Sequence, residues 1–380
     1  MKNILFVFGT RPEAIKLAPL VIEFKKDKQL VIKVCITAQH RELLDPVLNF
    51  FQIIPDYDLN LMQPNQGLMN FMANALTSLE NVFNKFNPDL VFVQGDTTTV
   101  LAGSLVAFHK KVRIAHVEAG LRSHNKHSPF PEEINRVITS QLADIHFAPT
   151  TKAVENLKQE GITDHVYLTG NTVIDALKIG IANTENKERE YSAYFEQINF
   201  SKKVILITCH RRESFGEPFK NICDALLEIA RTNPGFELVY PVHLNPNIND
   251  VANKLLLAEN IKLIPPLEYP QLIWLMNKSF LILTDSGGIQ EEAPTLGKPV
   301  LVLRDVTERT EGIDAGTAKL VGTGKENIVK ETLRLINDRR AYLEMSNAVN
   351  PYGDGSASMQ ILKIIKNISS LEAGELKSRK

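Results

Sequence analysis

Residues 4–20 read ILFVFGTRPEAIKLAPL. An apolar run of strand length ends at Gly9, and a helical pattern follows with Pro12 at a natural first helical position. A strand that passes through one glycine into a helix is typical of the first unit of a nucleotide-binding sheet. A dinucleotide-binding protein would place G-x-G-x-x-G at this turn, but here Gly9 precedes Thr10-Arg11-Pro12-Glu13. The missing second glycine argues against NAD.

Two cations follow the first strand instead. Arg11 and Lys16 are five residues apart at the entry of the predicted helix, where both could reach a phosphate, although Lys16 would also suit a solvated helix face. The second strand ends in Thr37-Ala38-Gln39-His40, without the acidic residue that holds an NAD ribose. The first half of the chain therefore favours an anion site over hydride transfer.

Strand-length apolar runs alternate with helix-length amphipathic segments along the chain, as in parallel sheets with crossover helices. The predicted strands span Asn3–Phe8, Val31–Thr37, Leu90–Gln94, Arg113–Val117, Ile145–Ala148, Val166–Leu168, Val204–Thr208, Glu237–Tyr240, Ile261–Leu263, Phe280–Thr284, Val300–Leu303 and Lys319–Val321. This alternation predicts an α/β fold with two doubly wound domains.

The length of 380 residues suits about two domains. We expect a first domain from residues 1–172 together with a C-terminal helix at 360–380, and a second from residues 173–359. The polar stretch at 183–203 has the composition of a connection between them. Two such sheets place ligands at the carboxyl ends of their strands, which predicts a cleft between facing domains.

The overall composition excludes several classes of protein. A formal net charge of −1 argues against broad nucleic-acid or membrane-surface binding. The sequence has no apolar run long enough to span a membrane and no signal-peptide pattern, so we expect a cytoplasmic protein. Its three cysteines, Cys35, Cys209 and Cys223, lack zinc spacing, and Cys209 is expected to be buried rather than nucleophilic. The histidines also lack metal-ligand spacing, which predicts no metal.

The stretch TDSGGIQEEAPTLGKPVLVLRDVTERTE, residues 284–311, carries the clearest ligand signal. A strand ends at Thr284, and Ser286-Gly287-Gly288 then leads into a helix, where small residues would let a pyrophosphate approach free N–H groups. Glu291 and Glu292 could accept hydrogen bonds from sugar hydroxyls, or could simply complement the helix dipole. Arg309 could bind an anion, or could be a solvated surface residue.

Acidic residues follow two neighbouring strands of the first domain. Asp96 comes directly after one buried strand, where it could be a helix N-cap, and Glu118 ends the next. Glu132 and Glu133 begin a later helix, one turn before Arg136. A carboxylate that ends an apolar strand is costly unless it is paired or used, so Glu118 points to function most clearly. Converging carboxylates suit proton transfer at a sugar.

The second domain adds histidines and arginines at strand ends. His210 could act as an acid or base or could bind phosphate, and the neighbouring Arg211 and Arg212 could bind anions. His243 follows the next strand and could equally be a structural histidine.

With these stretches in place, the chain resembles the non-hydrolysing UDP-N-acetylglucosamine 2-epimerases, closest to the enterobacterial type. The resemblance covers nearly the whole sequence and runs through GTRPEAIKLAPL, TAQHRELLD, QGDTTTVLAGSLVAF, HVEAGLRS, PFPEEINR, LTGNTVIDAL, HRRESFG, YPVHLNPN, LTDSGGIQEEAPTLGKPVLVLRD, TERTEG and NPYGDGSAS. It implies a GT-B-like pair of Rossmann-like domains and a homodimer that makes UDP-N-acetylmannosamine for cell-surface polysaccharide.

The reaction that this resemblance implies uses no cofactor and no metal. UDP is eliminated from UDP-N-acetylglucosamine to give 2-acetamidoglucal, and then re-adds with the opposite configuration at C2. The matching catalytic residues are Asp96, Glu118, Glu132 and His210. The matching substrate-binding residues are Arg11, Lys16, Arg136, Arg211, His243, Ser286, Gly287, Gly288, Glu292 and Arg309.

Some members of this family bind a second substrate molecule as an activator, through a Q-H-R-Q-like stretch and a nearby arginine. Here the stretch is Gln39-His40-Arg41-Glu42, and the later segment at 63–66 contains no arginine. This departure leaves two alternatives, that the chain is not activated by its substrate or that activation uses different contacts, and the candidate activator residues are Gln39, His40 and Glu42.

Three other functions stay open at this point. A GT-B glycosyltransferase would share the UDP half but would not need Asp96, Glu118 and Glu132 together. A hydrolysing epimerase would release UDP irreversibly, and a binding module would show no turnover.

Overall fold

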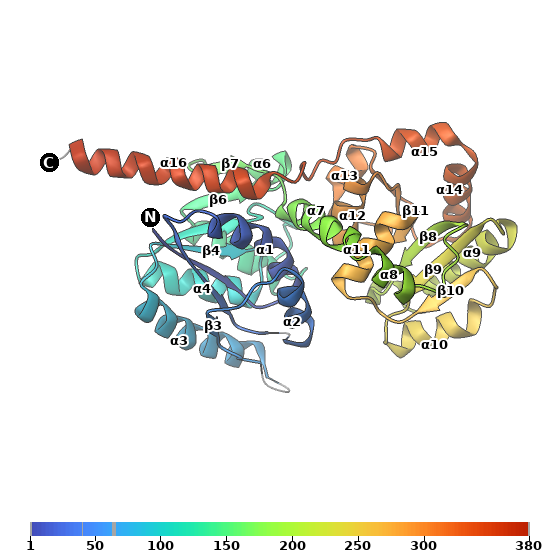
Figure 1. The fold of residues 1–380 in the computed structure, drawn as a ribbon, viewed down its shortest axis with the longest axis horizontal. Helices are drawn as coiled ribbons and strands as arrows, with labels where there is room; N and C mark the ends of the chain where they lie inside the picture. The colour runs from blue at the N-terminus through green and yellow to red at the C-terminus, as the bar shows by residue number, and fades with distance from the viewer. Residues whose placement is uncertain (1, 40, 63–65, 379–380) are drawn as a thin grey trace. The chain divides into compact units, whose positions relative to one another are not determined.

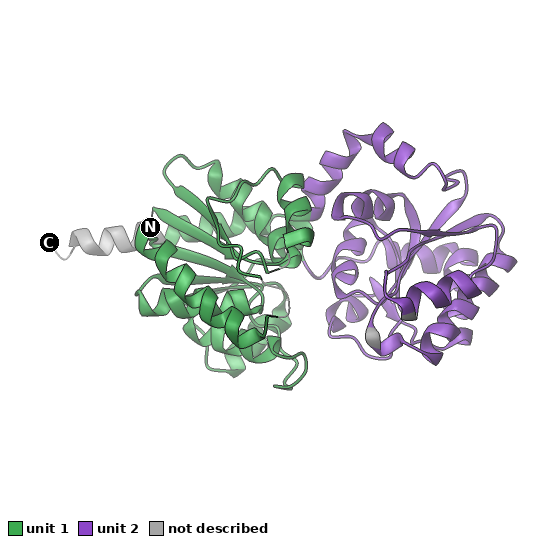
Figure 2. Ribbon diagram, turned by 90° about the horizontal axis from the view of Figure 1, so that it is seen from below, with its two compact units in different colours: residues 1–176, 353–380 green, residues 177–352 purple. Residues whose placement is uncertain are grey.

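The computed structural model describes residues 2–39, 41–62 and 66–378. The chain forms two compact units (Figure 2), one from Met1–Ala176 together with Gly353–Lys380 and the other from Leu177–Tyr352. We call them unit 1 and unit 2. The sequence-based division into independent domains, after residues 172 and 359, stays a prediction.

Unit 1 is built on a seven-stranded parallel sheet in the order β3-β2-β1-β4-β5-β6-β7. Its strands are β1 (Asn3–Phe8), β2 (Val31–Ile36), β3 (Tyr57–Asp58), β4 (Leu90–Gln94), β5 (Arg113–Val117), β6 (Ile145–Ala148) and β7 (Val166–Leu168). The central strands β1, β4, β5 and β6 are buried along almost their whole length, because helices cover both faces of a doubly wound sheet.

The helices that connect these strands (Figure 1) are α1 (Arg11–Lys25), α2 (Arg41–Phe50), α3 (Leu68–Phe86), α4 (Thr98–His109), α5 (Glu132–Leu142) and α6 (Thr151–Gln159). The next helix, α7 (Thr172–Glu185), begins in unit 1 and ends in unit 2, and α16 (Ala357–Ser378) returns to unit 1. Helix α1 is apolar around most of its circumference and therefore needs cover on two sides. The sheet covers one side, and α16 packs on α1 with Ile361 and Ile365 buried. A salt bridge of 2.7 Å joins Lys366 to Asp27.

Unit 2 has a six-stranded parallel sheet in the order β10-β9-β8-β11-β12-β13. Its strands are β8 (Lys203–Thr208), β9 (Phe236–Pro241), β10 (Ile261–Ile264), β11 (Ser279–Thr284), β12 (Val300–Val302) and β13 (Ala318–Leu320). Its helices are α8 (Glu188–Tyr194), α9 (Glu217–Thr232), α10 (Pro246–Leu255), α11 (Tyr269–Lys278), α12 (Gly287–Glu292), α13 (Thr310–Asp314), α14 (Lys325–Asn337) and α15 (Arg339–Ser346), with short 3₁₀ turns at Arg212–Ser214 and Ala293–Leu296.

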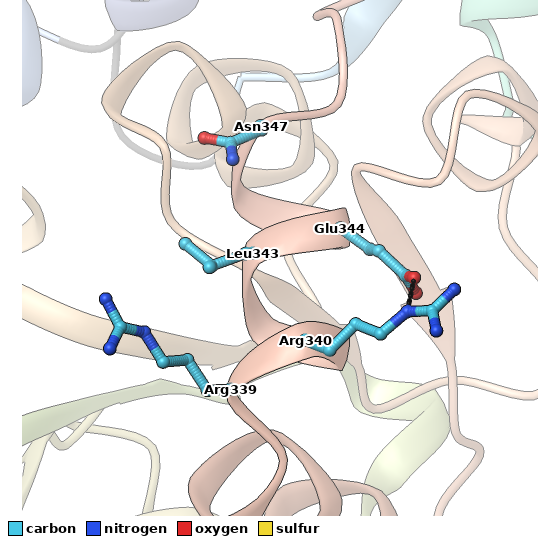
Figure 3. Close-up of a pocket in the computed structure, with 5 residues that line it drawn as sticks. All are labelled: Arg339, Arg340, Leu343, Glu344 and Asn347. Atoms are coloured by element: carbon cyan, nitrogen blue, oxygen red, sulfur yellow. Dashed lines mark hydrogen bonds and ion pairs between the residues drawn. The ribbon is translucent and has the colours of Figure 1, made fainter.

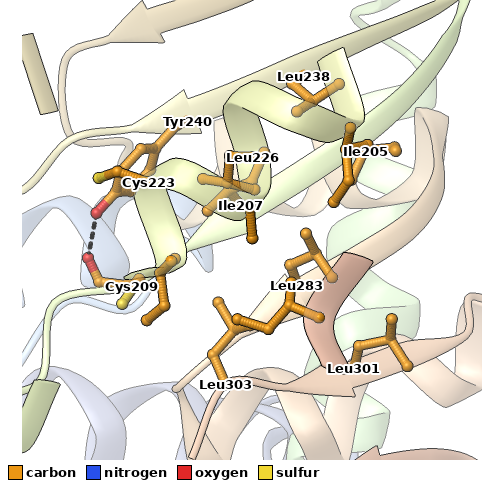
Figure 4. Close-up of a cluster of buried hydrophobic side chains, with 14 of the residues drawn as sticks. Ile205, Ile207, Cys209, Cys223, Leu226, Leu238, Tyr240, Leu283, Leu301 and Leu303 are labelled. Carbon is orange, nitrogen blue, oxygen red and sulfur yellow. Dashed lines mark hydrogen bonds between the residues drawn. The ribbon is translucent and has the colours of Figure 1, made fainter. Parts of the chain in front are cut away.

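The hydrophobic core of unit 2 lies between its sheet and α9 (Figure 4), and it extends to the strand ends. There the phenol of Tyr240 on β9 donates a 2.5 Å hydrogen bond to the carbonyl of Cys209, the residue before His210. Burial raises the pKa of the Cys209 thiol well above its usual range. Cys209 is buried, which confirms that part of the expectation.

Every predicted strand is present, and the predicted ends differ from the observed ones by no more than one residue. The two-residue β3 was not predicted. In the described residues the structure has no helix that is both long enough and apolar enough to cross a membrane.

The prediction for residues 183–203 was wrong. The chain passes between the units within α7, and this stretch already belongs to unit 2. The stretch contains α8, and the buried side chains of Tyr191 in this helix and Phe195 directly after it stack on Trp274 of α11, with 6.1 and 5.2 Å between ring centres. The indole N–H of Trp274 donates to Glu188 at 2.8 Å.

Candidate active site

The predicted site residues in both units gather at the carboxyl ends of the parallel strands. Asp96 follows β4 and Glu118 follows β5 in unit 1, while His210 follows β8 and Ser286 follows β11 in unit 2. In an open parallel sheet this edge is the usual place for a ligand, because helix N-termini and loops converge there.

Glu118 is the most tightly surrounded acid of unit 1. It has a φ of +62°, which is unusual for a residue with a side chain, and it is buried. The Lys16 ammonium contacts one oxygen, which also accepts a 3.2 Å hydrogen bond from the Asn171 amide. The Gln94 amide donates to the other oxygen. A carboxylate held at a strained backbone position by three donors is a candidate for function.

Asp96 lies in the next turn of the same sheet and is held by α5. The guanidinium of Arg136 contacts its carboxylate at 2.7 Å, and the Asn135 amide donates to its backbone carbonyl at 2.9 Å. Burial raises the pKa of Asp96, with the negative charges of Glu118 and Glu132 adding to the rise, while Arg136 and Lys16 oppose it. An acid whose environment favours the protonated form is suited to proton transfer.

The two acids at the start of α5 differ in their surroundings. Glu133 is buried and accepts backbone N–H bonds from Ser123 and His124 at 2.9–3.1 Å, so it holds the loop after Glu118 in place. These bonds lower the pKa of Glu133 despite its burial. Glu132 is half-buried, and within the described chain its carboxylate forms no hydrogen bond or salt bridge. Of these two acids, Glu132 is therefore the one whose carboxylate is available to contact a substrate.

The loop that follows Glu118 is fixed by backbone geometry and a buried arginine. Gly120 has a φ of +93°, and a Cβ there would lie 2.2 Å from the Ala153 carbonyl oxygen. The Arg122 guanidinium contacts both Glu160 oxygens at 2.7 Å and donates to Ser140 at 3.0 Å. The loop therefore has little freedom beside Glu118.

In unit 2, a buried aspartate that the sequence analysis did not single out organises the turn after β8. Asp285 is fully buried and accepts backbone N–H bonds from His210 at 2.7 Å and Arg211 at 2.8 Å. Its second oxygen lies 3.5 Å from His210 Nδ1. The imidazole stacks on that of His243, with 5.7 Å between ring centres. Burial lowers the pKa of His210, although Asp285 opposes the effect, so a neutral imidazole is favoured.

The Ser286-Gly287-Gly288 stretch begins α12, and the buried glutamates Glu291 and Glu292 end this short helix. Glu291 accepts a 2.6 Å hydrogen bond from Arg309 Nε, and Glu292 accepts one of 2.7 Å from the Tyr269 phenol. A Cβ at Gly287 would stand 3.6 Å from the Arg309 guanidinium. The same Cβ would stand 3.6 Å from a Glu308 carboxylate oxygen, so the glycine leaves space beside the ion pair of Arg309 and Glu308. The helix that begins here, α12, is only six residues long.

Further arginines surround Glu308 close to this turn. Arg304 contacts Glu308 at 2.9 Å and also pairs with Glu213, and Arg211 contacts Glu308 at 3.5 Å. Burial would raise the pKa of Glu308, but Arg309 and Arg304 lower it to about 2. A hollow of about 220 Å³ adjoins Arg304 and Glu213. Arg211 and Arg309 thus share the carboxylate of Glu308.

Two larger hollows differ in their relation to these residues. One of about 490 Å³ in unit 1 has an apolar lining that includes Met69 and Phe130, and it reaches Asn135, which holds Asp96. Another, of about 570 Å³ (Figure 3), is a shallow depression on the outside of α15. Its described lining residues come from one helix and its end and include none of the predicted site residues, so we assign it no catalytic role.

A family model described as UDP-N-acetylglucosamine 2-epimerase matches residues 22–366. The chain is 53% identical over 370 residues to the UDP-N-acetylglucosamine 2-epimerase of Escherichia coli K12, across 96% of this chain and 98% of the relative. It belongs to the UDP-N-acetylglucosamine 2-epimerase family. The crystal structure of the Neisseria meningitidis UDP-GlcNAc 2-epimerase bound to UDP-GlcNAc superposes with a TM-score of 0.88 at 51% identity, covering 96% of this chain and 100% of that one.

The epimerase fold is shared beyond the family. The crystal structure of the glycosyltransferase of kitacinnamycin superposes with a TM-score of 0.62 at 10% identity, covering 96% of this chain and 98% of that one. Such a match shows a common GT-B-like fold alone. The fold alone therefore cannot distinguish an epimerase from a glycosyltransferase. The distinction depends on the chemistry of individual side chains, above all the acids of unit 1.

The sequence analysis did not single out several residues that contact the candidate site residues, although three of them left a trace in the sequence. Gln94, Asn171 and Asp285 are polar residues at or just after strands, within QGD, LTGN and TDSGG. Tyr269 left no such trace, because a tyrosine before a helical apolar pattern reads as core.

The candidate activator residues are only partly described. His40 lies outside the described residues. Gln39 is half-buried, with its carbonyl oxygen turned inward, and Glu42 is exposed in the first turn of α2. An activator site at these positions stays a prediction.

Proposed function

We propose that this chain interconverts UDP-N-acetylglucosamine and UDP-N-acetylmannosamine by elimination and re-addition of UDP, and thereby supplies a sugar for cell-surface polysaccharide. The observation that carries the proposal is the pair Glu118 and Asp96 at adjacent strand ends of unit 1, one strained and held by three donors, the other biased toward protonation. Membership of the epimerase family supports the same assignment.

The chemistry needs an acid, a base and an anion site, and no hydride carrier. A base removes the proton from C2 while the C1–O bond breaks, and the bonding pair leaves with UDP. The product, 2-acetamidoglucal, has its double bond between C1 and C2. A proton then reaches C2 from the opposite face, and the UDP oxygen returns to C1. Carboxylates can carry both protons.

The residues of unit 1 would perform the proton transfers. Asp96, Glu118 and Glu132 are the proton carriers, and Arg136 sets the charge of Asp96 through its 2.7 Å contact. Lys16 was predicted to bind phosphate, but here its ammonium contacts Glu118. We therefore assign Lys16 a second task, which is to stabilise Glu118 as an anion.

The residues of unit 2 would hold the departing UDP. Ser286, Gly287 and Gly288 leave space for the diphosphate beside Arg309, and Glu292 accepts hydrogen bonds from the ribose. His210, favoured as a neutral imidazole, stabilises the charge that develops on UDP, with Arg211 and His243 beside it. From unit 1, Arg11 is assigned to the phosphates as well.

Incubation of the protein with UDP-N-acetylglucosamine alone in deuterated water tests this function. The expected result is deuterium at C2 in both sugars and appearance of the manno epimer. A donor that stays unchanged until an acceptor is added would identify a glycosyltransferase instead. Irreversible accumulation of UDP with free N-acetylmannosamine would identify a hydrolysing epimerase, and binding without turnover a binding module.

The assembly state and cellular location belong to the same proposal. We infer a homodimer, supported by the family resemblance and by exposed apolar side chains of unit 1, among them Met69 and Phe130. A cytoplasmic location is supported by three cysteines that are all buried and free. Sedimentation equilibrium at micromolar concentration should give twice the chain mass of 42.6 kDa, and a monomer would contradict the dimer.

A further inference from the structure

The carboxylate of Glu13 lies at the centre of the turn after β1 and is almost completely buried. One of its oxygens accepts hydrogen bonds from the backbone N–H groups of Gly9 at 3.1 Å and Thr10 at 2.8 Å. Its other oxygen accepts a 2.9 Å hydrogen bond from the hydroxyl of Thr97. Glu13 thus uses one oxygen for its own turn and the other for the turn after β4.

These two turns carry residues that the proposed function assigns to different tasks. Thr10 directly precedes Arg11, which we assign to the phosphates, and Thr97 directly follows Asp96, which we assign to proton transfer. The turns belong to neighbouring strands, because β1 pairs with β4. The nearby hydroxyls of Thr37, just after β2, and Thr99, in the first turn of α4, lie 2.8 Å apart, so this contact joins the end of β2 to α4 and not the Arg11 turn to the Asp96 turn.

Two further hydrogen bonds hold the backbone of the turn around Asp96. His116 contacts the Gly95 carbonyl at 2.8 Å, and Asn135 donates to the Asp96 carbonyl at 2.9 Å. His116 belongs to β5 and Asn135 to α5, so these two contacts hold the turn from that side of the sheet. The hydrogen bond that the Thr97 hydroxyl donates to Glu13 instead connects it to the turn after β1. Glu13 therefore differs from an ordinary acid in the first turn of a helix, which is exposed to solvent and needs no partner in a neighbouring turn.

We propose that Glu13 is a positioning residue that fixes the Arg11 turn and the Asp96 turn relative to each other. The inference rests on the proposed function, because it assigns Glu13 to the geometry of that reaction. Burial raises the pKa of Glu13 to about 7, while the bonds from Thr10, Thr97 and Gly9 oppose the rise. These hydrogen bonds therefore favour the ionised carboxylate of Glu13, whereas burial favours its protonated form.

Thr97→Val tests the link, because it removes the hydroxyl that reaches Glu13 while nearly keeping the side-chain shape. We expect kcat to fall by about 10-fold or more, since a displaced reacting group costs rate steeply, with KM within about 3-fold of wild type. Thr97→Ser keeps the hydroxyl and should restore kcat to within about 2-fold.

Thr97 also caps α4 by accepting from the Val100 N–H at 3.3 Å, so the cap needs its own control. Thr150 caps α6 in the same unit by accepting from Ala153 at 3.2 Å. Thr150→Val should lower the unfolding midpoint as Thr97→Val does, but should leave kcat per folded molecule unchanged.

The outcomes separate the two proposals. If wild type epimerises and Thr97→Val matches Thr97→Ser in kcat, the link has no positioning role and the inference is overturned. If Thr150→Val loses as much kcat as Thr97→Val, cap loss explains the effect and the inference is overturned again. A wild type that does not exchange deuterium at C2 overturns the proposed function, and with it the task assigned to Glu13.

Discussion

At the scale of single residues, the environment of each acid distinguishes groups that look alike in the sequence. Glu132 and Glu133 are adjacent, yet Glu133 holds the backbone of Ser123 and His124 and Glu132 makes no such contact in the described chain. From the sequence, both residues were predicted to lie at the start of a helix, with nothing to distinguish them. The difference arises because successive helical residues point about 100° apart, so only one of them reaches the loop.

Glu118→Gln keeps the shape of the most tightly held acid and removes its charge. We expect UDP to bind about as well as to wild type, while the rate falls at least ~10²-fold, the usual effect of losing a proton-transfer group. Isothermal titration with UDP and initial-rate measurements check the two parts. Glu80→Gln, at a surface acid paired with Lys110, is the control and should leave the rate unchanged. Turnover near that of wild type would remove Glu118 from the mechanism.

Arg136→Met should change the pH dependence of the reaction through Asp96. Arg136 lowers the pKa of Asp96 against the effect of burial, so its removal raises that pKa further. Activity that needs ionised Asp96 is lost as the pH falls through the pKa, so the acidic limb of kcat/KM should move to higher pH. Arg136→Lys keeps the charge and should shift the limb less. Profiles that coincide for all three proteins would show that Asp96 does not control the limb.

At the scale of elements, strand positions were predictable because buried parallel strands are continuous apolar runs bounded by polar turns. The two-residue β3 is too short to form such a run. Helix α8 was not predicted because its buried residue, Tyr191, stands among charged and polar residues, and the buried Phe195 follows only after the helix ends. The turns after the strands were predictable, but the hydrogen bonds within them were not, since Asp285 and Glu13 accept hydrogen bonds from the backbone of other residues.

Gly120→Ala tests how strictly the loop after Glu118 is fixed. The added Cβ would lie 2.2 Å from the Ala153 carbonyl at a φ of +93°, so strain and overpacking together should cost more than about 2 kcal/mol of unfolding free energy. Gly161→Ala is matched, because its φ is +80° but nothing lies within 4 Å, and it should cost about 1 kcal/mol. Urea titrations measure both. Equal losses would mean that the loop yields to the clash.

At the scale of the whole molecule, unit 2 carries its own reporter. The chain has a single tryptophan, Trp274, packed between Phe195 and Phe200 inside unit 2, so its fluorescence reports the unfolding of that unit. The sequence resemblance predicted which half would hold UDP. It could not predict which aromatic side chains would pack around the tryptophan, because these come from segments far apart in the chain.

UDP should raise the unfolding midpoint that tryptophan fluorescence reports. A ligand at 100 times its dissociation constant adds about 2.7 kcal/mol to the folded state. Glu292→Gln weakens the acceptor that we assign to the ribose and should reduce the shift at equal UDP concentration. The control is Glu344→Gln on the outer surface of α15, paired only with Arg340 among the described residues, which should respond as wild type does. No shift with UDP in wild type would place UDP binding outside unit 2.

The helix that closes unit 1 also sets the order in which the molecule can be made. Unit 1 takes its sheet from the first 176 residues and its cover for α1 from residues after 352, whereas unit 2 is continuous. A ribosome synthesises the chain from its N-terminus, and domains fold as their residues emerge. The apolar outer side of α1 therefore stays without Ile361 and Ile365 until these residues have been made, which is after the whole of unit 2. Unit 1 begins the chain, but unit 2 is the first that can be completed.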